Sequence, residues 1–419
     1  MTEITLNHGT CLDFYRVKHQ RVCGATSSEL QEKINEMIYL DNAATSWPKP
    51  PQVKEAMNRF MEEIGANPGR SGHFLSIEAA RIVYETREAL SVLFHVKDSS
   101  RIIFTLNATE SINLALKGLL KPQDHVITSS MEHNSVMRPL RELEKKGIEL
   151  SVIPCSKEGM LDPQEVGKRI RSNTRMVVLN HASNVTGTLL PVKEVGFITR
   201  NHDLLFLIDA AQTAGAYPID VEKEGIDLLA FTGHKSLYGP QGTGGLVLGE
   251  RIKEKEMIPL KQGGTGSRSE FEEQPDFLPD RFESGTPNGV GISGLLAGVQ
   301  FVLEKGVEQI RQKEMSLVEK LIVGLKEVRQ VKIYGPEHYQ DRVATLSFNF
   351  AHLSPSNGAL RLEKEFGILC RPGLHCAPAA HHTIGTFPEG TIRFGLSVFN
   401  TEADVEATIR AVSLIAQGR

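Results

Sequence analysis

One lysine lies where a cofactor could be bound covalently. Residues 231–245 read FTGHKSLYGPQGTGG, so Lys235 follows an apolar run and a short polar turn and precedes a glycine-rich loop. Open α/β sheets bind their ligands at the carboxyl ends of their strands, which is where this lysine would lie. An amine held there can form a Schiff base with a carbonyl group. A solvated surface lysine is the alternative, and the rest of the chain decides between the two interpretations.

Three further polar residues follow other apolar runs of the chain. Thr109 comes after RIIFT in a segment that opens a predicted helix, where a hydroxyl and free N–H groups suit a phosphate. His133 comes after HVITS, where an imidazole could stack on a flat ring, and Asn184 comes after MVVLN. A helix cap would explain Thr109 alone, and a structural histidine would explain His133 alone.

A carboxylate and three more polar side chains complete the pattern. Asp209 ends the run LLFLI, and burying it costs energy unless a positive group pairs with it. A protonated pyridine nitrogen would be such a group, and the pair would make the ring a better electron sink. Gln212 follows Asp209, and Thr232 and His234 lie beside Lys235. In chain order, these residues describe a site for pyridoxal 5′-phosphate (PLP).

Strand-like and helix-like segments alternate from Ile38 onward. Residues 53–64 and 76–94 carry apolar side chains at helical spacing, and further helical candidates lie at 110–120, 134–146, 163–172, 191–201, 291–304 and 307–328. The short apolar runs are RIIFT, HVITS, SVIP, MVVLN, LLFLID, LLAFT and GGLVLG. The alternation predicts an α/β fold with a mostly parallel sheet covered by helices on both faces.

Composition excludes several classes of function. The 419 residues are 40% hydrophobic and 23% charged, with a formal net charge of −4 and no long basic run, so nucleic acid is not expected as a partner. No apolar stretch has the length of a bilayer span, and the N-terminus carries no secretory apolar region. Five scattered cysteines, an odd number, favour a reducing compartment. We therefore expect a cytoplasmic protein.

The chain divides into an extension and two predicted domains. Residues 1–37 lack periodicity, apart from a polar helical candidate at 28–36, and we expect them to be loosely ordered and dispensable. Residues 51–298 form the predicted large domain. Residues 38–50 together with 299–419 form a smaller α/β domain, and 261–290 form a long functional loop.

Cys376 is the candidate nucleophile that selects the reaction. It lies in the Gly/Pro-rich segment RPGLHCAP, near Arg371 and His375, and an accessible cysteine near positive charge is a good nucleophile. An inert loop thiol is one alternative. A metal site is another, formed from His375, Cys376, His381 and His382, although their spacing is irregular. We expect Cys370 to be buried, and Cys11, Cys23 and Cys155 to have no catalytic role.

These residues lie in motifs that resemble a known family over residues 38–415. The motifs are YLDNAATS (39–46), NATESIN (107–113), MEHNS (131–135), HASNVTGT (181–188), IDAAQ (208–212), FTGHKSLYGPQGTGG, RFESGTPN (281–288), RPGLHCAP (371–378) and IRFGLSVFNT (392–401). The chain resembles the PLP-dependent enzymes of fold type I, in the class-V aminotransferase superfamily and its cysteine desulfurase branch. The resemblance implies a large domain with a mostly parallel seven-stranded sheet and a smaller C-terminal α/β domain.

The resemblance assigns a role to each cofactor residue. Lys235 would bind PLP, Asp209 would pair with its pyridine nitrogen and His133 would stack on its ring. Gln212 and Asn184 would lie near the phenolic oxygen. Thr109, Thr232 and His234 would bind the phosphate. Thr286 would reach the phosphate of a neighbouring subunit, which implies a homodimer with shared active sites.

The resemblance also implies an L-cysteine desulfurase. Lys235, His133 and Cys376 would be catalytic, and the Cys376 thiolate would attack the sulfur of the substrate. L-Alanine and a persulfide on Cys376 would result, and an acceptor protein or small thiol would take the sulfur. Arg393, with Arg371 and Asn184, would bind the substrate carboxylate. No metal is implied.

The sequence leaves the subgroup and the physiological role open. The short spacing from FGILC to Cys376 is similar to the compact-loop, Suf-type subgroup, yet Pro372 and Leu374 stand where those enzymes usually have Thr and His. A selenocysteine lyase, an aminotransferase or an epimerase of the superfamily would keep the same cofactor residues, and a non-catalytic scaffold is a rival of a different class. The sulfur could serve iron–sulfur cluster assembly, thio-cofactor synthesis or cysteine breakdown.

Overall fold

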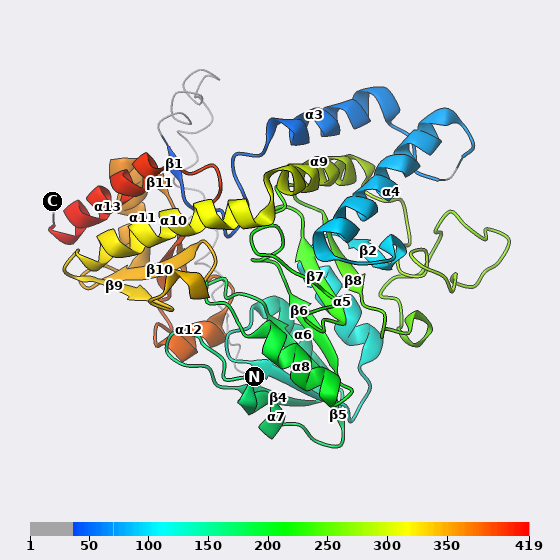
Figure 1. Cartoon of the computed structure of the whole chain (residues 1–419), viewed down its shortest axis with the longest axis horizontal. Coiled ribbons are helices and arrows are strands. Elements are labelled where there is room, and N and C mark those ends of the chain that lie inside the picture. The colour runs from blue at the N-terminus through cyan, green and yellow to red at the C-terminus, as the bar shows by residue number, and fades with distance from the viewer. Residues whose placement is uncertain (1–36, 70, 419) are drawn as a thin grey trace, which may run out of the picture.

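A computed structural model describes residues 37–69 and 71–418 of the chain. The predictions for residues 1–36, including the polar helix at 28–36, the loosely ordered extension and the two cysteines Cys11 and Cys23, lie outside the described residues. The described part consists of a large central sheet with helices around it and a second, smaller sheet with its own helices (Figure 1).

The central sheet has seven strands in the order β2-β8-β7-β6-β5-β3-β4. Their pairing is parallel, except that β8 runs antiparallel to both of its neighbours. The strands are β2 (Ile102–Thr105), β3 (His125–Ser129), β4 (Glu149–Ile153), β5 (Thr174–Asn180), β6 (Leu205–Asp209), β7 (Leu228–Thr232) and β8 (Gly244–Leu248). Each of the seven apolar runs of the sequence forms one of them, and the prediction of a mostly parallel sheet is confirmed.

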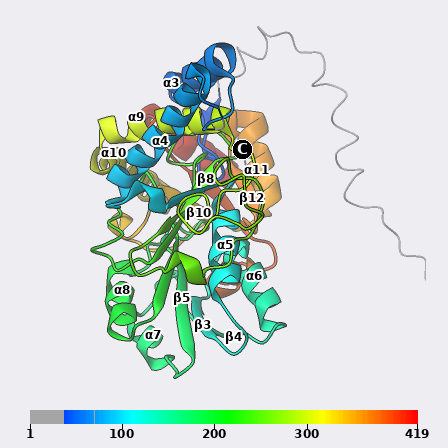
Figure 2. The same ribbon diagram turned by 90° about the vertical axis from the view of Figure 1, so that its right-hand side faces the viewer.

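Alternate residues of each strand enter two separate hydrophobic cores, because side chains on a strand point to opposite faces. Val177 and Leu179 of β5 join one core with helices α4 (Phe74–Phe94), α8 (Val192–Asn201) and α9 (Gly289–Lys305). Met176 and Val178 join the other core with α5 (Ala108–Leu119) and α6 (Asn134–Glu144). Figure 2 shows α5 and α6 on one side of the strands and α8 on the other.

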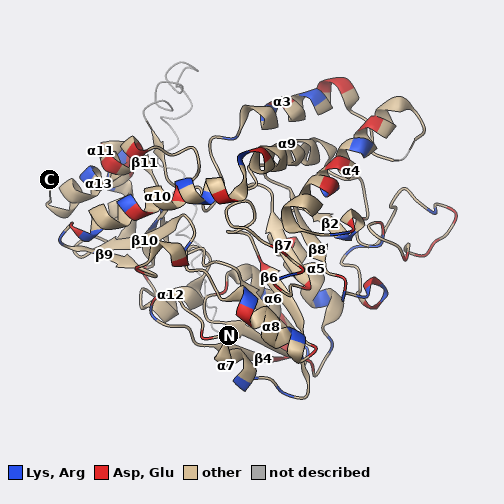
Figure 3. Ribbon diagram, in the orientation of Figure 1, with Lys and Arg blue, Asp and Glu red and all other residues tan. Residues whose placement is uncertain are grey.

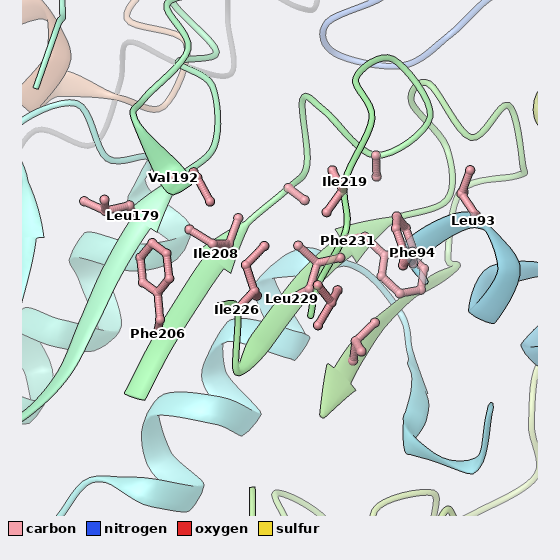
Figure 4. Packing of buried hydrophobic residues seen from close by; sticks show 14 of the residues in the cluster. Leu93, Phe94, Leu179, Val192, Phe206, Ile208, Ile219, Ile226, Leu229 and Phe231 are labelled. Atoms are coloured by element: carbon pink, nitrogen blue, oxygen red, sulfur yellow. The ribbon is translucent and has the colours of Figure 1, made fainter. Parts of the chain in front are cut away.

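The first of these cores is continuous across several strands. Phe206 and Ile208 of β6 lie beside Leu229 and Phe231 of β7 (Figure 4). The ring of Phe231 lies 5.3 Å from that of Phe94 in α4, measured between centroids. Burial on both faces explains why these strands are apolar runs without alternation, as is typical of parallel sheets.

The smaller sheet has four antiparallel strands in the order β12-β13-β10-β9. They are β9 (Val331–Tyr334), β10 (Thr345–Phe350), β12 (Arg371–Gly373) and β13 (Thr391–Gly395), and they pack with α10 (Val307–Lys326), α11 (Pro355–Phe366) and α13 (Glu402–Ala416). The short strand β1 (Ile38–Tyr39) pairs with β11 (Ile368–Leu369), and Leu40 lies in the same core. This pairing supports the proposed grouping of residues 38–50 with the C-terminal part.

The remaining helices are short. They are α3 (Pro51–Arg59), which continues into a π-helical turn at Phe60–Ile64, α7 (Gln164–Lys168) and α12 (Pro378–Ile384). Residues 257–288 form no helix or strand, as the sequence predicts for 261–290. Figure 3 shows acidic and basic residues interspersed along α3, α4 and α10.

Among the described residues, no single helix has the length and hydropathy of a membrane span. The adjoining helices α9 and α10 pass that test only as a pair, on length and composition, and they are bent by 80° relative to each other.

Candidate active site

A cavity of about 280 Å³ lies at the carboxyl ends of strands β5, β6 and β7. It brings together every predicted cofactor residue except Thr286. Its lining consists of Asn107, Ala108, Thr109, His133, Ser135, Asn180, Ala182, Asn184, Asp209, Ala211, Gln212, Thr232, His234 and Lys235. The position of these residues just after apolar runs therefore predicts most of the candidate site, because the residues that follow parallel strands lie together at one edge of the sheet.

Lys235 lies three residues beyond the end of β7 in a tightly bonded loop. Its carbonyl accepts hydrogen bonds from Tyr238 N and from Ser46 Oγ, both at 2.8 Å. Burial lowers the pKa of Lys235 to about 8, against the opposing effect of the Asp209 carboxylate, and the charges of Arg393 and Arg371 lower it further. An amine with such a pKa is partly neutral near pH 7, as a nucleophile must be.

Asp209 and His133 are joined through Ser135. Asp209 Oδ1 accepts a hydrogen bond from Ala211 N at 2.9 Å, and Oδ2 accepts one from Ser135 Oγ at 3.3 Å. His133 Nδ1 lies 2.8 Å from Ser135 Oγ and accepts a hydrogen bond from Ser135 N at 3.0 Å. Burial lowers the pKa of His133 to about 4, so the ring is neutral and its proton is on Nε2.

The part of the cavity at the start of helix α5 can receive an anion. Helix α5 begins at Ala108, and the first N–H groups of a helix have no acceptor within it. Thr109, Thr232 and His234 add their side chains to this end. Burial lowers the pKa of His234 to about 4, with a smaller effect from Lys235.

Unpartnered polar atoms show that the cavity is made for a polar ligand. Asn180 Oδ1, Asn184 Oδ1 and His234 Nδ1 are buried and have no hydrogen-bond partner within the described chain. Buried polar atoms without a partner cost energy, which a ligand would recover. The cavity thus offers an amine, a carboxylate, a stacking ring and an anion site to a flat, phosphorylated, carbonyl-bearing molecule.

Cys376 lies beside this cavity but does not line it. It is exposed in the turn before α12, and its carbonyl accepts a hydrogen bond from Asn134 N at 2.9 Å, one residue beyond His133. Arg371 Nη2 lies 3.9 Å from the sulfur. By contrast, burial raises the pKa of Cys370 to about 12 and that of Cys155 to about 11, so neither thiol is prepared to react.

Arg393 is almost wholly buried, with 1% of its side chain exposed. Its Nη2 forms an ion pair with Asp41 Oδ1 at 2.9 Å, and its Nη1 donates to Asn184 O at 3.0 Å. Its Nε has no partner among the described residues. The guanidinium is thus fixed on two sides and keeps N–H groups for a further acceptor.

Sequence reasoning missed several residues of the site. Asp41 and Ser46 come from the N-terminal segment, as does Ala43, whose carbonyl accepts a hydrogen bond from Gln212 Nε2 at 3.0 Å. They follow no strand of the central sheet, so the motif YLDNAATS was the only signal for them. Ser135 lies within the motif MEHNS and Asn180 ends β5, and both could have been found from those positions.

Thr286 lies elsewhere, in a second cavity of about 880 Å³ that we call the larger cavity. Tyr84, Phe104, Lys261 and Gly285 also line it, whereas Lys235 does not. The larger cavity has the greater volume, but it lacks Lys235 and Asp209, the amine and carboxylate that line the smaller cavity. We therefore do not take it as the catalytic centre. Among the described residues, no group of three or more His, Cys, Asp or Glu side chains is arranged to hold a metal ion.

Residues 38–408 match the family model of the class-V aminotransferases. The chain belongs to this family. Its relatives include a probable cysteine desulfurase of Methanothermobacter thermautotrophicus, 33% identical over 89% of this chain and 93% of that protein. A probable cysteine desulfurase of Pyrococcus abyssi is 35% identical over 88% and 92%, and the cysteine desulfurase IscS of Dictyoglomus turgidum is 31% identical over 91% and 94%.

Solved structures of the family share the fold. The apo cysteine desulfurase of Thermococcus onnurineus NA1 superimposes with a TM-score of 0.87 at 32% identity, covering 94% of this chain and 99% of that one. The cysteine desulfurase CsdA of Escherichia coli, in an S-sulfonic acid form, gives a TM-score of 0.82 at 28% identity, with the same coverage. The predicted family and fold are confirmed, whereas the Suf-type subgroup stays a prediction.

Proposed function

We propose that this protein is a PLP-dependent L-cysteine desulfurase that forms a persulfide on Cys376. The observation that carries the proposal is that two sites lie side by side. Lys235 lines a cavity with Asp209 and His133. The exposed Cys376 is held next to that cavity, because its carbonyl accepts a hydrogen bond from Asn134, the residue after His133. The names of the relatives and of the solved structures support the same activity.

The cavity residues fit PLP. Lys235 would bind it covalently, Asp209 would pair with its pyridine nitrogen and His133 would stack on its ring. Its phosphate would lie at the start of α5, with Thr109, Thr232 and His234 as ligands, and Gln212 and Asn184 would lie near the phenolic oxygen. Bound there, PLP supplies an electron sink for the bonds at Cα of an amino acid.

Lys235 and Arg393 prepare the substrate. With the cofactor holding the substrate amine, Lys235 would be free, and its neutral form could accept the Cα proton, since burial lowers its pKa to about 8. Arg393 binds the substrate carboxylate through the N–H groups that Asp41 and Asn184 leave free. Arg371, from β12, provides a second positive charge on this side, near Cys376.

Cys376 carries out the sulfur transfer. Its thiolate attacks the substrate sulfur, so that the new S–S bond forms as the C–S bond of the substrate breaks. The electron pair of that bond stays with Cβ of the substrate, which takes up a proton, and return of the proton from Lys235 to Cα would complete L-alanine. Cys376 keeps the added sulfur as a persulfide until an acceptor thiol removes it.

The decisive experiment replaces the nucleophile. Incubating the holoenzyme with L-cysteine should yield L-alanine and a peptide containing Cys376 that is heavier by one sulfur atom. Cys376→Ala should form no alanine while keeping the visible absorbance of the bound cofactor, and Cys155→Ala should behave as the wild type does. Full desulfurase activity in Cys376→Ala would contradict the proposal.

The same experiment separates the rival functions. An aminotransferase would need a 2-oxo acid and would stay active in Cys376→Ala, and a scaffold would show no visible band that depends on Lys235. Assays with L-selenocysteine distinguish a selenocysteine lyase. A homodimer, a cytoplasmic location and a protein or small-thiol acceptor for the sulfur remain proposals of ours.

A further inference from the structure

The segment that carries Cys376 has an unusual backbone. His375 and Cys376 adopt φ angles of 49° and 58°, in the left-handed region that residues with a Cβ seldom occupy. Two such residues in succession hold their conformation only where surrounding contacts impose it. The contacts of residues 371–377, which we call the cysteine loop, should therefore determine where the thiol lies.

Two hydrogen bonds tie the cysteine loop to the cofactor cavity. Asn184, which lines the cavity, donates from Nδ2 to His375 O at 2.7 Å. Asn134 donates from its backbone N–H to Cys376 O at 2.9 Å, next to His133. Both ties hold carbonyl groups, and neither holds a side chain of the loop.

The side chain of His375 provides the third tie. The imidazole is buried, and its Nε2 lies 3.2 Å from both Thr391 O and Thr391 Oγ1 in β13. Because a carbonyl can only accept, the ring proton must be on Nε2 for that bond to form. Its Nδ1 is buried without a partner among the described residues.

The bond to Thr391 continues back to the cavity wall. Thr391 Oγ1 donates to Ser347 Oγ at 2.9 Å, and Ser347 Oγ donates to Val185 O at 2.7 Å. Val185 follows Asn184, which in turn bonds to the carbonyl of His375. The hydrogen bonds thus form a closed circuit of buried groups between the cavity wall, the smaller sheet and the cysteine loop.

We propose that His375 is a positioning residue for Cys376, which holds the left-handed cysteine loop in place by donating a hydrogen bond from Nε2 to Thr391. This role rests on the proposed function, in which the thiol must reach the substrate sulfur. His375 acts as a fixed donor and transfers no proton. Consistent with this, burial, together with the nearby Arg393, His381 and Arg371, lowers the pKa of His375 to about 2, so the ring is neutral near pH 7.

The first test compares His375→Ala with His375→Gln. Glutamine carries an N–H donor at about the same distance from the backbone as Nε2, whereas alanine carries none. We expect His375→Ala to lower kcat for alanine formation about 100-fold, as misplacement by about 1 Å does. KM should stay within about threefold and the cofactor absorbance should be unchanged. His375→Gln should recover to within about tenfold of wild-type kcat, with the wild-type pH profile.

Ser347→Ala tests the circuit without touching the cysteine loop. It should lower kcat less than His375→Ala does, and the two effects should not add in the double variant, because both break the same circuit. This variant keeps the test decisive even if His375→Ala fails to fold. The matched control is His382→Ala, since His382 is exposed on α12 and stacks on Phe387 outside the circuit.

Hydrogen exchange gives a reading that does not depend on activity. The amide of Asn134, which donates to Cys376 O, should exchange faster in His375→Ala and at the wild-type rate in His382→Ala. Unchanged exchange, wild-type kcat in His375→Ala, or a glutamine variant as poor as the alanine variant would each overturn the proposal. A wild-type enzyme that makes no alanine would instead refute the desulfurase assignment and leave the exchange result standing.

Discussion

Lys235 and Lys49 are both partly buried, yet only Lys235 lines the cavity. Burial lowers the pKa of each to about 8. Lys49 is already bonded through Nζ to Ser46 Oγ at 2.7 Å and to His234 O at 2.8 Å, on the far side of the loop. A lowered pKa therefore does not by itself distinguish the two lysines, and it is the position of Lys235 in the cavity that supports the proposal that it binds the cofactor.

The pH dependence of cofactor capture tests this assignment. Only the neutral amine attacks a carbonyl, so capture of PLP by the apo protein should quicken about tenfold per pH unit below pH 8 and level off above it. Borohydride reduction and peptide mapping should find the label on Lys235 and not on Lys49. A label on Lys49, or a midpoint near pH 10, would contradict the assignment.

The same shift has a consequence for the stability of the apo protein. Between about pH 8 and the ordinary pKa of 10.5, the unfolded chain keeps the proton of Lys235 while the folded chain has lost it. The contribution of this group to the free energy of unfolding therefore rises with pH in that window.

Asp41 and Arg393 form the second pair with a testable role. Asp41→Ala would leave a buried guanidinium without its acceptor on one side, so we expect KM for L-cysteine to rise about tenfold or more. Asp41→Asn keeps an oxygen acceptor, and KM should stay within about threefold. Steady-state kinetics of the two variants check this.

A control and a contrary outcome complete the Asp41 test. Asp203→Ala removes a carboxylate that is 98% exposed and paired with Arg251, and it should change nothing in the kinetics. Equal KM values for the alanine and asparagine variants would show that charge, and not orientation, is what Asp41 provides.

At the scale of elements, α9 holds the loop that carries Lys235. A Cβ added at Gly298 would lie 2.3 Å from Leu237 O and 2.8 Å from Gly239 N, closer than atoms can pack. Helix propensity favours alanine over glycine by about 1 kcal/mol, but overpacking costs about 1–3 kcal/mol, so the close contact should prevail. The glycine lets the helix lie directly against the backbone of the loop.

Substitution of Gly298 by alanine should therefore lower both Tm and the fraction of protein that retains cofactor. Gly167→Ala is the matched control, because no atom lies within 4 Å of a Cβ there and the backbone is not left-handed. It should leave cofactor content unchanged and raise Tm slightly. Thermal unfolding and the visible absorbance of each variant measure the two effects.

The elements of the central sheet could be predicted from sequence, and those of the smaller sheet only in part. Strands buried on both faces are apolar throughout, as Leu205–Asp209 and Leu228–Thr232 are, and such runs stand out. Strands β11 and β12 have two and three residues and are partly exposed, so they leave no periodic signal.

The residues of the candidate site could likewise be predicted from sequence only in part. Asp209, His133 and Lys235 follow strands whose carboxyl ends meet, so topology predicts that they converge. The pairing of Asp41 with Arg393 joins residues 352 positions apart through an inner strand of a different sheet, and no local pattern specifies it. The resemblance supplied Arg393, and the motif YLDNAATS contains Asp41 but does not indicate that the two residues pair.

At the scale of the whole molecule, Thr286 and Lys235 of one chain line different cavities. If Thr286 serves the cofactor of a second copy, the larger cavity lies where the two copies meet. Tyr84, which is 59% exposed and lines that cavity, should then be covered in the dimer.

Introducing a negative charge on this surface tests the proposed dimer. Sedimentation should give the wild type a mass of twice the 46.2 kDa of one chain. We expect the Tyr84→Glu variant to dissociate into monomers and to bind its cofactor less tightly. Phe197→Glu is the control, because Phe197 is 69% exposed on α8 and lines neither cavity. A monomeric wild type with full cofactor content would contradict the role given to Thr286.

The pairing of β1 with β11 bears on how the enzyme is made in the cell. A ribosome makes Leu40 and Asp41 before the strands of the central sheet, whereas β13, with Arg393 and Gly395, is made after all of them. The central sheet can assemble during synthesis, but the segment around Asp41 must wait without its partners until β13 has been added. Arg393, which we propose binds the substrate, therefore acquires its carboxylate partner only after the whole central sheet has been made, and a chain cut before β13 would have that sheet without this pair.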